Sequence, residues 1–160
     1  MEIVYCILYL AIIGFISNFV GDRIDRKKIF IKSFPFSAFK FEKDGLFYEK
    51  FRIRKWKDIL PDMSKIRPSM VKKKVKQYRS IEEKTALIEE TCVAEIVHVV
   101  LIPLGIPCFI IGGWLWGGIS FAVWTLGNIP FIMIQRYNRA RLFILLDRLK
   151  KKAEHSSDES

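Results

Sequence analysis

Residues capable of acid–base chemistry are gathered on one short stretch of this chain. Thr91, Glu95 and His98 are spaced i, i+4 and i+7, so they share one face of a helix. Histidine gains and loses a proton near neutral pH, and a carboxylate one turn away can orient its ring and stabilise its protonated form. We therefore predict proton transfer at this face, joined by Glu90. The alternatives are a structural ion pair and, for Glu90, a solvated helix-end charge.

A second polar stripe lies nearer the C-terminus. Asn128 and Gln135 are seven residues apart on one helical face, and Asn138 and Arg139 continue the stripe. Snorkelling and hydrogen bonding between helices would explain Arg141 and Arg136. They do not explain such a density of Asn, Gln, Tyr and Arg beside an apolar segment, so the stripe predicts contact with a substrate.

Three apolar stretches position these residues: 3–20, 94–111 and 114–134. At about 1.5 Å per residue, each can cross about 30 Å of hydrocarbon. The last two are joined by an uncharged turn of Gly and Trp, which predicts a tight hairpin. The first begins with Glu2 and lacks a basic leader, so we expect a retained helix rather than a cleaved signal peptide. The pattern predicts an all-α integral membrane protein with about three spanning helices.

The start of the second predicted helix is marked by Ser80 and Glu83, which form a capping box. Uninterrupted, this helix carries the polar face into the bilayer until Pro103 and Pro107 end or kink it.

Charge predicts the orientation. The formal net charge is +10, and all 27 Lys and Arg fall between residues 22 and 90 or after residue 134. Basic residues near span ends stay on the cytoplasmic side. We expect an external N-terminus, a cytoplasmic interfacial region over 22–90 and a cytoplasmic C-terminus. Residues 1–152 then form one multi-pass membrane domain, its polar site toward the cytoplasmic face, and 153–160 form a polar tail.

The region 22–90 has the composition of a membrane-surface segment. Residues 33–45 alternate aromatic with small and basic side chains around Pro35, which predicts an irregular or re-entrant segment at headgroup level. Basic clusters follow at 52–57 and 72–79. Beside spanning helices we expect them to bind anionic lipid headgroups, at about 1 kcal/mol per basic residue, rather than nucleic acid.

Several site classes are excluded by composition. The three cysteines, Cys6, Cys92 and Cys108, have no CxxC spacing, and there are only two histidines. A disulfide framework and a metal site are therefore not expected. The chain also has no glycine-rich phosphate loop, and we expect no cofactor.

Four strings, in the same order and within about residues 34–142, resemble one known family. They are Phe39-Lys40-Phe41-Glu42-Lys43-Asp44-Gly45, Arg54-Lys55-Trp56-Lys57, Glu90-Thr91 with Ala94-Glu95 and His98, and Asn128-Ile129-Pro130 with Gln135-Arg136-Tyr137-Asn138-Arg139. They resemble the bacterial glycosyl-diaponeurosporenoate acyltransferases, which perform the final acylation in staphyloxanthin synthesis. This chain departs from the family pattern at Cys92 and Val93, where the family has basic residues, which argues against Cys92 as a nucleophile.

The resemblance implies an enzyme of the bacterial cell membrane that moves a fatty acyl group from a thioester such as acyl-CoA to a hydroxyl of a membrane glycolipid or lipid, of the carotenoid glucoside kind. His98 would be the general base with Glu95 fixing its tautomer, and Asn128 or Gln135 would donate to the carbonyl oxygen. The predicted catalytic residues are His98, Glu95, Thr91 and Asn128. The predicted substrate-binding residues are Glu90, Gln135, Arg136, Tyr137, Asn138, Arg139, Arg54, Lys55, Trp56 and Lys57, the cationic ones among them serving donor phosphates.

Two other classes stay open at this point. A lipid-binding or carrier protein would use the same polar stripe to hold a headgroup without turnover. A small subunit of a larger membrane complex would use the polar residues to recognise its partner.

Overall fold

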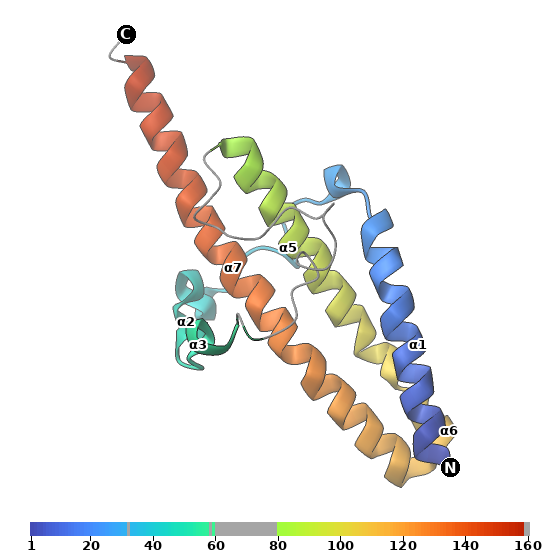
Figure 1. Ribbon diagram of the computed structural model, residues 1–160. Helices are drawn as coiled ribbons and strands as arrows, with labels where there is room; N and C mark the ends of the chain where they lie inside the picture. Colours follow the sequence, from blue (N-terminus) through green and yellow to red (C-terminus); the bar gives the residue numbers. More distant parts are fainter. Residues whose placement is uncertain (32, 58, 60–79, 159–160) are drawn as a thin grey trace. The chain divides into compact units, whose positions relative to one another are not determined.

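The computed structural model describes residues 1–31, 33–57, 59 and 80–158, and every regular element within them is helical (Figure 1). The long helices are α1 (Glu2–Arg23), α5 (Ile81–Leu101) and α7 (Gly118–Asp158). The short elements are η1 (Arg26–Lys28), η2 (Lys40–Gly45), α2 (Leu46–Glu49), α3 (Ile53–Trp56), η3 (Pro103–Gly105), α6 (Cys108–Gly112) and η4 (Gly113–Gly117).

The chain divides into two compact units. The first comprises Met1–Asp25 and Val93–Met133, and the second comprises Arg26–Cys92 and Ile134–Ser160. Helices α5 and α7 contribute to both units, so each unit contains one part of each helix. The two units are described separately below.

The first unit contains the predicted hairpin. The indole Nε1 of Trp124 on α7 donates to the Leu101 carbonyl at 2.6 Å, which ties α7 to the end of α5. The turn needs glycine at two positions. Gly113 has φ of 63°, a left-handed conformation, and a Cβ on Gly117 would lie 2.3 Å from the Cys108 carbonyl oxygen. Gly and Trp thus form the tight turn that the sequence predicts.

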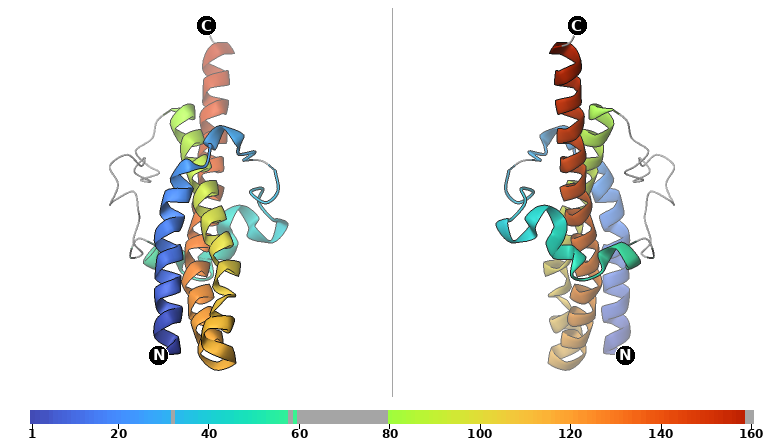
Figure 2. Two further views of the ribbon diagram at one scale, coloured as in Figure 1. Left: turned by 90° about the vertical axis from the view of Figure 1, so that its right-hand side faces the viewer. Right: turned by 90° about the vertical axis from the view of Figure 1, so that its left-hand side faces the viewer.

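Helix α1 packs beside this turn through small residues and hydrogen bonds. The Cys6 thiol lies 3.6 Å from the Cys108 carbonyl oxygen, and the Tyr9 hydroxyl donates to the Leu104 carbonyl at 2.8 Å. Figure 2 shows the start of α1 beside α6 in both views. Close approach through small residues and side-chain hydrogen bonds is typical of helices in a membrane.

The apolar surface of the long helices faces outward. Two helical stretches, Glu2–Arg23 and Ile81–His155, are long and apolar enough to cross a membrane, yet only 11% and 22% of their most apolar windows are buried. The core helix of a soluble protein would be mostly buried. The helical, membrane-compatible character predicted from the sequence is therefore confirmed. The number of spans and the orientation of the termini stay predictions.

In the second unit, α5 begins where the sequence predicts. The Ser80 N–H donates to Glu83 Oε2 at 3.3 Å, and the Glu83 N–H donates to Ser80 Oγ at 3.1 Å, which is the reciprocal pattern of a capping box. The helix then runs without a break to Leu101, and Pro103 opens the short η3. Both predicted ends of the helix are confirmed.

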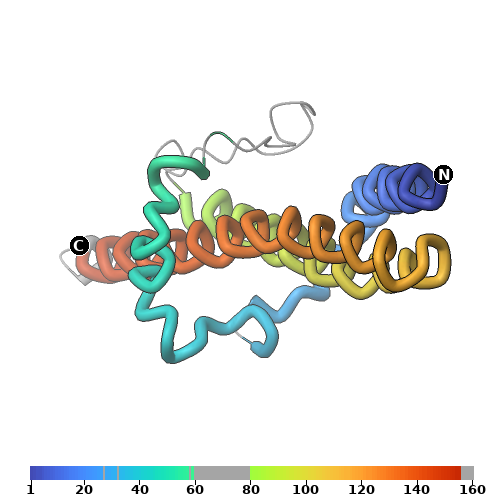
Figure 3. Tube along the Cα trace, turned by 90° about the horizontal axis from the view of Figure 1, so that it is seen from below, coloured from blue at the N-terminus to red at the C-terminus, as the bar shows by residue number. Residues whose placement is uncertain are grey.

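The aromatic segment 33–45 is irregular, as predicted. It consists of turns followed by η2, and Lys43, Asp44 and Gly45 all have positive φ. A Cβ on Gly45 would lie 3.4 Å from the Ala140 side chain and 3.5 Å from that of Tyr137, so this bend lies directly on α7. Figure 3 shows the segment crossing α7. Its location at a membrane surface stays a prediction.

Helix α7 extends well past the predicted third span. It continues through the polar residues after position 134 to Asp158, with Leu142 and Leu146 buried along the way. The predicted polar tail is thus helical as far as the structure describes it. The basic cluster at 72–79 lies outside the described residues.

Candidate functional site

His98 and Asn128 form a hydrogen-bonded pair in the first unit. His98 Nδ1 lies 2.9 Å from Asn128 Oδ1, and the ring stacks on Phe131 with centroids 4.6 Å apart. The other end of the amide is also held, because Asn128 Nδ2 donates to the Trp124 carbonyl at 2.9 Å. The amide oxygen therefore faces the imidazole. The amide oxygen accepts a hydrogen bond, so Nδ1 carries a hydrogen, and in the neutral ring Nε2 then carries the lone pair.

This tautomer is the form that a general base requires. With Nδ1–H held by an acceptor, Nε2 is the nitrogen that can receive a proton. The hydrogen bond to Asn128 holds the ring from the opposite arm of the hairpin. Glu95 is buried on α5, and its role in fixing the tautomer stays a prediction, as does donation by Asn128 or Gln135 to a substrate carbonyl.

One further hydroxyl in this unit attracts notice. Thr125 Oγ1 is buried and has no hydrogen-bond partner in the part of the chain that the structure describes. It lies three residues before Asn128 on the same helix, and residues three apart are neighbours on a helix surface. A buried hydroxyl without a partner costs about 1–3 kcal/mol, so this hydroxyl is a candidate for a contact with a ligand.

Thr91 belongs to the second unit and bonds within its own helix. It is 1% exposed, and its hydroxyl donates to the Ile88 carbonyl at 2.6 Å. Threonine makes this bond commonly in helices. The catalytic role of Thr91 stays a prediction.

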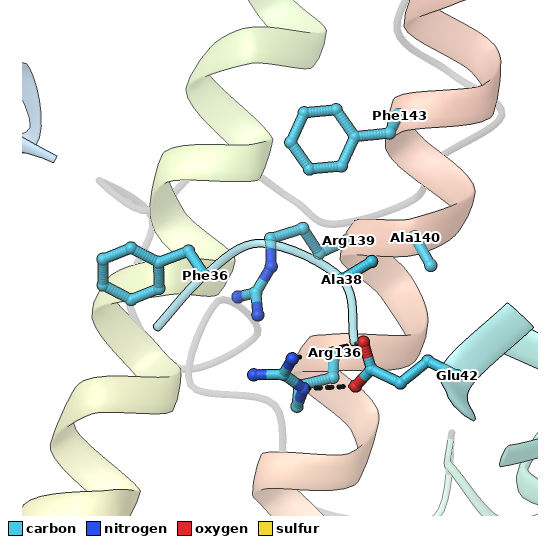
Figure 4. Close-up of a pocket in the computed structure, with 7 residues that line it drawn as sticks. All are labelled: Phe36, Ala38, Glu42, Arg136, Arg139, Ala140 and Phe143. Carbon is cyan, nitrogen blue, oxygen red and sulfur yellow. Dashed lines mark hydrogen bonds and ion pairs between the residues drawn. The ribbon is translucent and has the colours of Figure 1, made fainter. Parts of the chain in front are cut away.

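A buried ion pair joins Glu42 to Arg136 in the second unit (Figure 4). Arg136 Nε donates to Glu42 Oε1, and Nη2 donates to Oε2 at 3.2 Å. The Tyr48 hydroxyl also donates to Glu42 Oε1, and the Phe39 N–H donates to Oε2 at 2.8 Å. Such two-point pairing between a guanidinium and a carboxylate is the strongest class of protein hydrogen bonding.

Arg136 also binds the backbone of the irregular segment. It donates to the Pro35 carbonyl at 3.1 Å and to the Ser37 carbonyl at 3.2 Å, and its guanidinium carbon lies 4.4 Å from the centre of the Phe39 ring. These contacts fasten residues 35–42 to α7, and the predicted substrate contact of Arg136 stays a prediction.

The electrostatics of the pair follow from its burial and its donors. Burial by itself would raise the pKa of the Glu42 carboxyl, but the hydrogen bonds from Arg136, Tyr48 and Phe39, together with the charge of Arg136, hold that pKa below its usual value of 4.5. Burial, and then the carboxylate that accepts its hydrogen bond, raise the pKa of Tyr48. At neutral pH the carboxyl is therefore ionised and the phenol is neutral.

Beside this pair is a small pocket of about 200 Å³ of empty space, which includes space open to solvent. Its lining is Phe36, Ala38, Glu42, Arg136, Arg139, Ala140 and Phe143 (Figure 4). Arg139 is 3% exposed, and its Nη1 lies 3.6 Å from Cys92 Sγ. Its guanidinium carbon lies 5.6 Å from the centre of the Phe36 ring. The pocket thus joins apolar walls to a buried cation.

Tyr137 brings two arginines together on another side of α7. Arg54 Nε donates to the Tyr137 hydroxyl at 3.1 Å, and Arg141 Nη1 donates to the same oxygen at 2.7 Å. Arg54 also pairs with Glu49. The predicted contact residues Arg54 and Tyr137 therefore lie together, with Arg141 as a third member that we had interpreted as snorkelling.

The other predicted binding residues are dispersed. Glu90 makes an ion pair with Arg26 at 2.9 Å, and the Trp56 indole donates to the Phe51 carbonyl at 2.9 Å. Gln135 is buried, Asn138 and Lys57 are half-buried and Lys55 is exposed. Within the described ranges, no three His, Cys, Asp or Glu side chains gather as metal ligands would.

Sequence reasoning did not assign site roles to three residues: Glu42, Thr125 and Arg141. Glu42 appeared only within the family string, and its charge resembled that of the other polar residues of a surface segment. The residues around Thr125 are those of an ordinary apolar helix, so nothing in the sequence distinguishes its hydroxyl. Arg141 is set apart only because it shares Tyr137 with Arg54, and the contact of Arg54 with Tyr137 depends on the fold.

Comparison with known proteins decides the family. The sequence family described as glycosyl-4,4'-diaponeurosporenoate acyltransferase matches residues 30–148. The protein of that name from Staphylococcus aureus strain MRSA252 is 34% identical over 151 residues, which cover 94% of this chain and 91% of the relative. The chain belongs to the glycosyl-4,4'-diaponeurosporenoate acyltransferase family. The relatives from strains Newman and N315 are 34% and 33% identical over the same lengths. No solved structure matches.

Family membership decides between the three classes that the sequence left open. The glycosyl-4,4'-diaponeurosporenoate acyltransferases carry the name of an enzyme, and the match over residues 30–148 includes most of the second unit as well as the hairpin of the first. The chain is therefore an acyltransferase rather than a carrier or an accessory subunit. The resemblance inferred from the four strings is confirmed.

Proposed function

We propose that this chain transfers an acyl group from a thioester donor to a hydroxyl of a membrane lipid, with His98 as the general base. The observation that carries the proposal is the hydrogen bond between His98 Nδ1 and Asn128 Oδ1, with the amide held from behind by the Trp124 carbonyl. This arrangement supports a neutral imidazole with its lone pair on Nε2. General base catalysis of this kind contributes about 100- to 10,000-fold.

The proposed step is a single displacement at the thioester carbonyl. His98 Nε2 takes the proton of the acceptor hydroxyl while the hydroxyl oxygen forms a bond to the acyl carbon. The carbon–sulfur bond breaks, the thiolate leaves, and the proton held by His98 neutralises that thiolate. The products are a lipid ester and a free thiol, and the imidazole returns to its starting form.

The acceptor in this proposal is a lipid-linked sugar hydroxyl. The relatives are named for a glycosyl carotenoid acid, an amphiphile whose chain would lie among hydrocarbon and whose sugar would lie at the surface. The outward apolar surfaces of α1 and of the α5 and α7 hairpin support a membrane setting for that chemistry. The donor we propose is acyl-CoA or a similar thioester.

Within the first unit, Asn128 is proposed as a positioning residue and Thr125 as a donor to substrate. Both polar ends of the Asn128 amide are occupied, by His98 and by Trp124. Thr125 Oγ1 is the buried hydroxyl without a partner in the described residues. Donation from that hydroxyl to the carbonyl oxygen would stabilise negative charge as it develops there. The predicted roles of Glu95 and Gln135 remain part of the hypothesis.

The test is acyl transfer by the purified full-length chain. Detergent-solubilised protein would be incubated with radiolabelled acyl-CoA and a glycosyl carotenoid acid, and lipid products would be resolved by chromatography and mass spectrometry. We expect a new labelled ester from the native chain and a loss of at least 100-fold with His98→Ala. An equally folded His98→Ala protein with native turnover would refute His98 as the base. No ester from the native chain with any glycolipid acceptor would refute the proposed acceptor class.

A further inference from the structure

The hydroxyl of Tyr137 receives two positive charges from different elements. Arg54 comes from α3 and donates through Nε at 3.1 Å, and Arg141 comes from α7 and donates through Nη1 at 2.7 Å. The Arg141 guanidinium also lies 5.5 Å from the centre of the Tyr137 ring. Two guanidinium groups that share one neutral oxygen repel each other, so this arrangement has an electrostatic cost.

Little negative charge offsets this cost. Glu49 pairs with Arg54, and the Arg54 side chain is still 62% exposed. Arg141 is exposed, and in the part of the chain that the structure describes no carboxylate lies within ion-pair distance of it. Two guanidinium charges therefore face one carboxylate, and both guanidiniums remain open to a ligand.

The phenol holds the two guanidiniums together. Its oxygen has two lone pairs, and the two arginines use both. Tyr137 itself is only 1% exposed, so its hydroxyl is covered and serves to hold the two arginines. The exposed guanidiniums are the groups that can donate to an added ligand, and guanidinium groups match the oxygen geometry of phosphate.

We infer that Arg54 and Arg141, held together by the Tyr137 hydroxyl, bind a phosphate ester. The bound anion relieves the repulsion between the two guanidiniums and accepts hydrogen bonds from both of them. Two sources have this chemistry: the phosphates of a nucleotide thioester donor and the phosphodiester of a phospholipid headgroup. The assignment of the donor as the source rests on the proposed function, whereas phosphate binding itself does not.

Binding is measured on the purified full-length chain in dodecyl maltoside, which contains no phosphate. Coenzyme A probes the nucleotide source, pantetheine is its phosphate-free control, and dihexanoyl phosphatidylglycerol probes the lipid source. We expect coenzyme A or the phospholipid to bind and pantetheine not to bind. Arg141→Gln and Arg54→Gln should each weaken that binding by about tenfold, which corresponds to about 1.4 kcal/mol. Failure of both phosphate probes to bind the native chain would overturn the inference.

Arg148→Gln is the matched control, because Arg148 is an exposed arginine on the same helix, outside the cluster. An equal loss with Arg148→Gln would reveal a general charge effect and would overturn the site. Tyr137→Phe keeps the ring beside Gly45 and removes the hydroxyl, so it should weaken phosphate binding while the protein stays folded. Unchanged binding in Tyr137→Phe and Arg141→Gln together would also overturn it.

The His98→Ala variant separates this inference from the proposed function. It should bind phosphate esters with native affinity, because His98 belongs to neither guanidinium contact. Phosphate binding without acyl transfer in the native chain would support the phosphate site and refute the proposed reaction. Native acyl transfer by Arg141→Gln, with unchanged donor KM and unchanged phosphate binding, would support the reaction and refute the phosphate site.

Discussion

The side chains of Glu42 and Arg136 are joined by two hydrogen bonds, although 94 positions separate them in the chain. Their side chains are only 4% and 8% exposed. The pair fastens the irregular segment before α2 to the middle of α7, and it forms one wall of the small pocket beside Arg139. The shape of this pocket in the second unit therefore depends on one buried ion pair.

Removal of one partner of this pair should destabilise the second unit. Glu42→Ala leaves the Arg136 charge buried without its carboxylate, which costs about 3–5 kcal/mol. The control is Glu49→Ala, because the Glu49 pair with Arg54 is exposed and such pairs contribute about 0–1 kcal/mol. Chemical denaturation in detergent, followed by limited proteolysis of the region 33–45, measures both. Equal stability of the two variants would contradict the structural role of the pair.

The same pair predicts a pH dependence of stability. The folded-state pKa of Glu42 lies below its usual value of 4.5, so its stabilising contribution is present above about pH 4.5 and is lost as pH falls through the folded pKa. The native chain should therefore lose stability more steeply than Glu42→Gln below pH 4.5, because the amide does not titrate. Denaturation midpoints of both proteins at pH 7, 5, 4 and 3 measure the difference. A constant difference across that range would show that the pKa of Glu42 is the same in the folded and unfolded chains, which would contradict the lowered pKa of the buried pair.

Asn128→Ala should lower turnover without a comparable change in acceptor binding. Without the amide oxygen, the Nδ1–H of His98 loses its hydrogen-bond acceptor. The imidazole then populates both neutral tautomers and loses its fixed orientation. We expect kcat to fall by about 10- to 100-fold, within the range of general base effects, with little change in KM. Asn18→Ala is the control, because Asn18 Nδ2 likewise donates to a carbonyl one turn back, that of Gly14, at 3.0 Å. A similar kcat for the two variants would argue against the positioning role.

Thr125→Val separates a functional hydroxyl from a structural one. The substitution conserves the shape of the side chain and removes a buried hydroxyl that has no hydrogen-bond partner among the described residues. The free energy of unfolding should therefore rise by about 1 kcal/mol or stay unchanged. Turnover should nevertheless fall by about tenfold or more if that hydroxyl donates to substrate. Thermal unfolding and initial rates on the same preparation measure both. A stabilised variant with native turnover would eliminate Thr125 from the proposed reaction.

Much of the fold could be predicted from the sequence because the controlling interactions are local. The Ser80 and Glu83 cap forms within one helical turn, Pro103 ends α5 by its own covalent geometry, and Gly113 permits the turn before α7. Apolar length along the chain likewise indicated long helices with outward apolar surfaces. The sequence also indicated the family, because short strings of residues in a fixed order are enough to recognise it.

The partners of the site residues were decided only by the tertiary structure. Helical spacing placed His98 and Glu95 on one face, but the residue at His98 Nδ1 is Asn128, from the other arm of the hairpin. Snorkelling would have sufficed to explain Arg136 and Arg141 from the sequence, yet Arg136 binds Glu42 and Arg141 shares Tyr137 with Arg54. Such contacts depend on the rotation and register of one segment against another. A periodic pattern within a single helix specifies which side chains share a face and leaves open what that face meets.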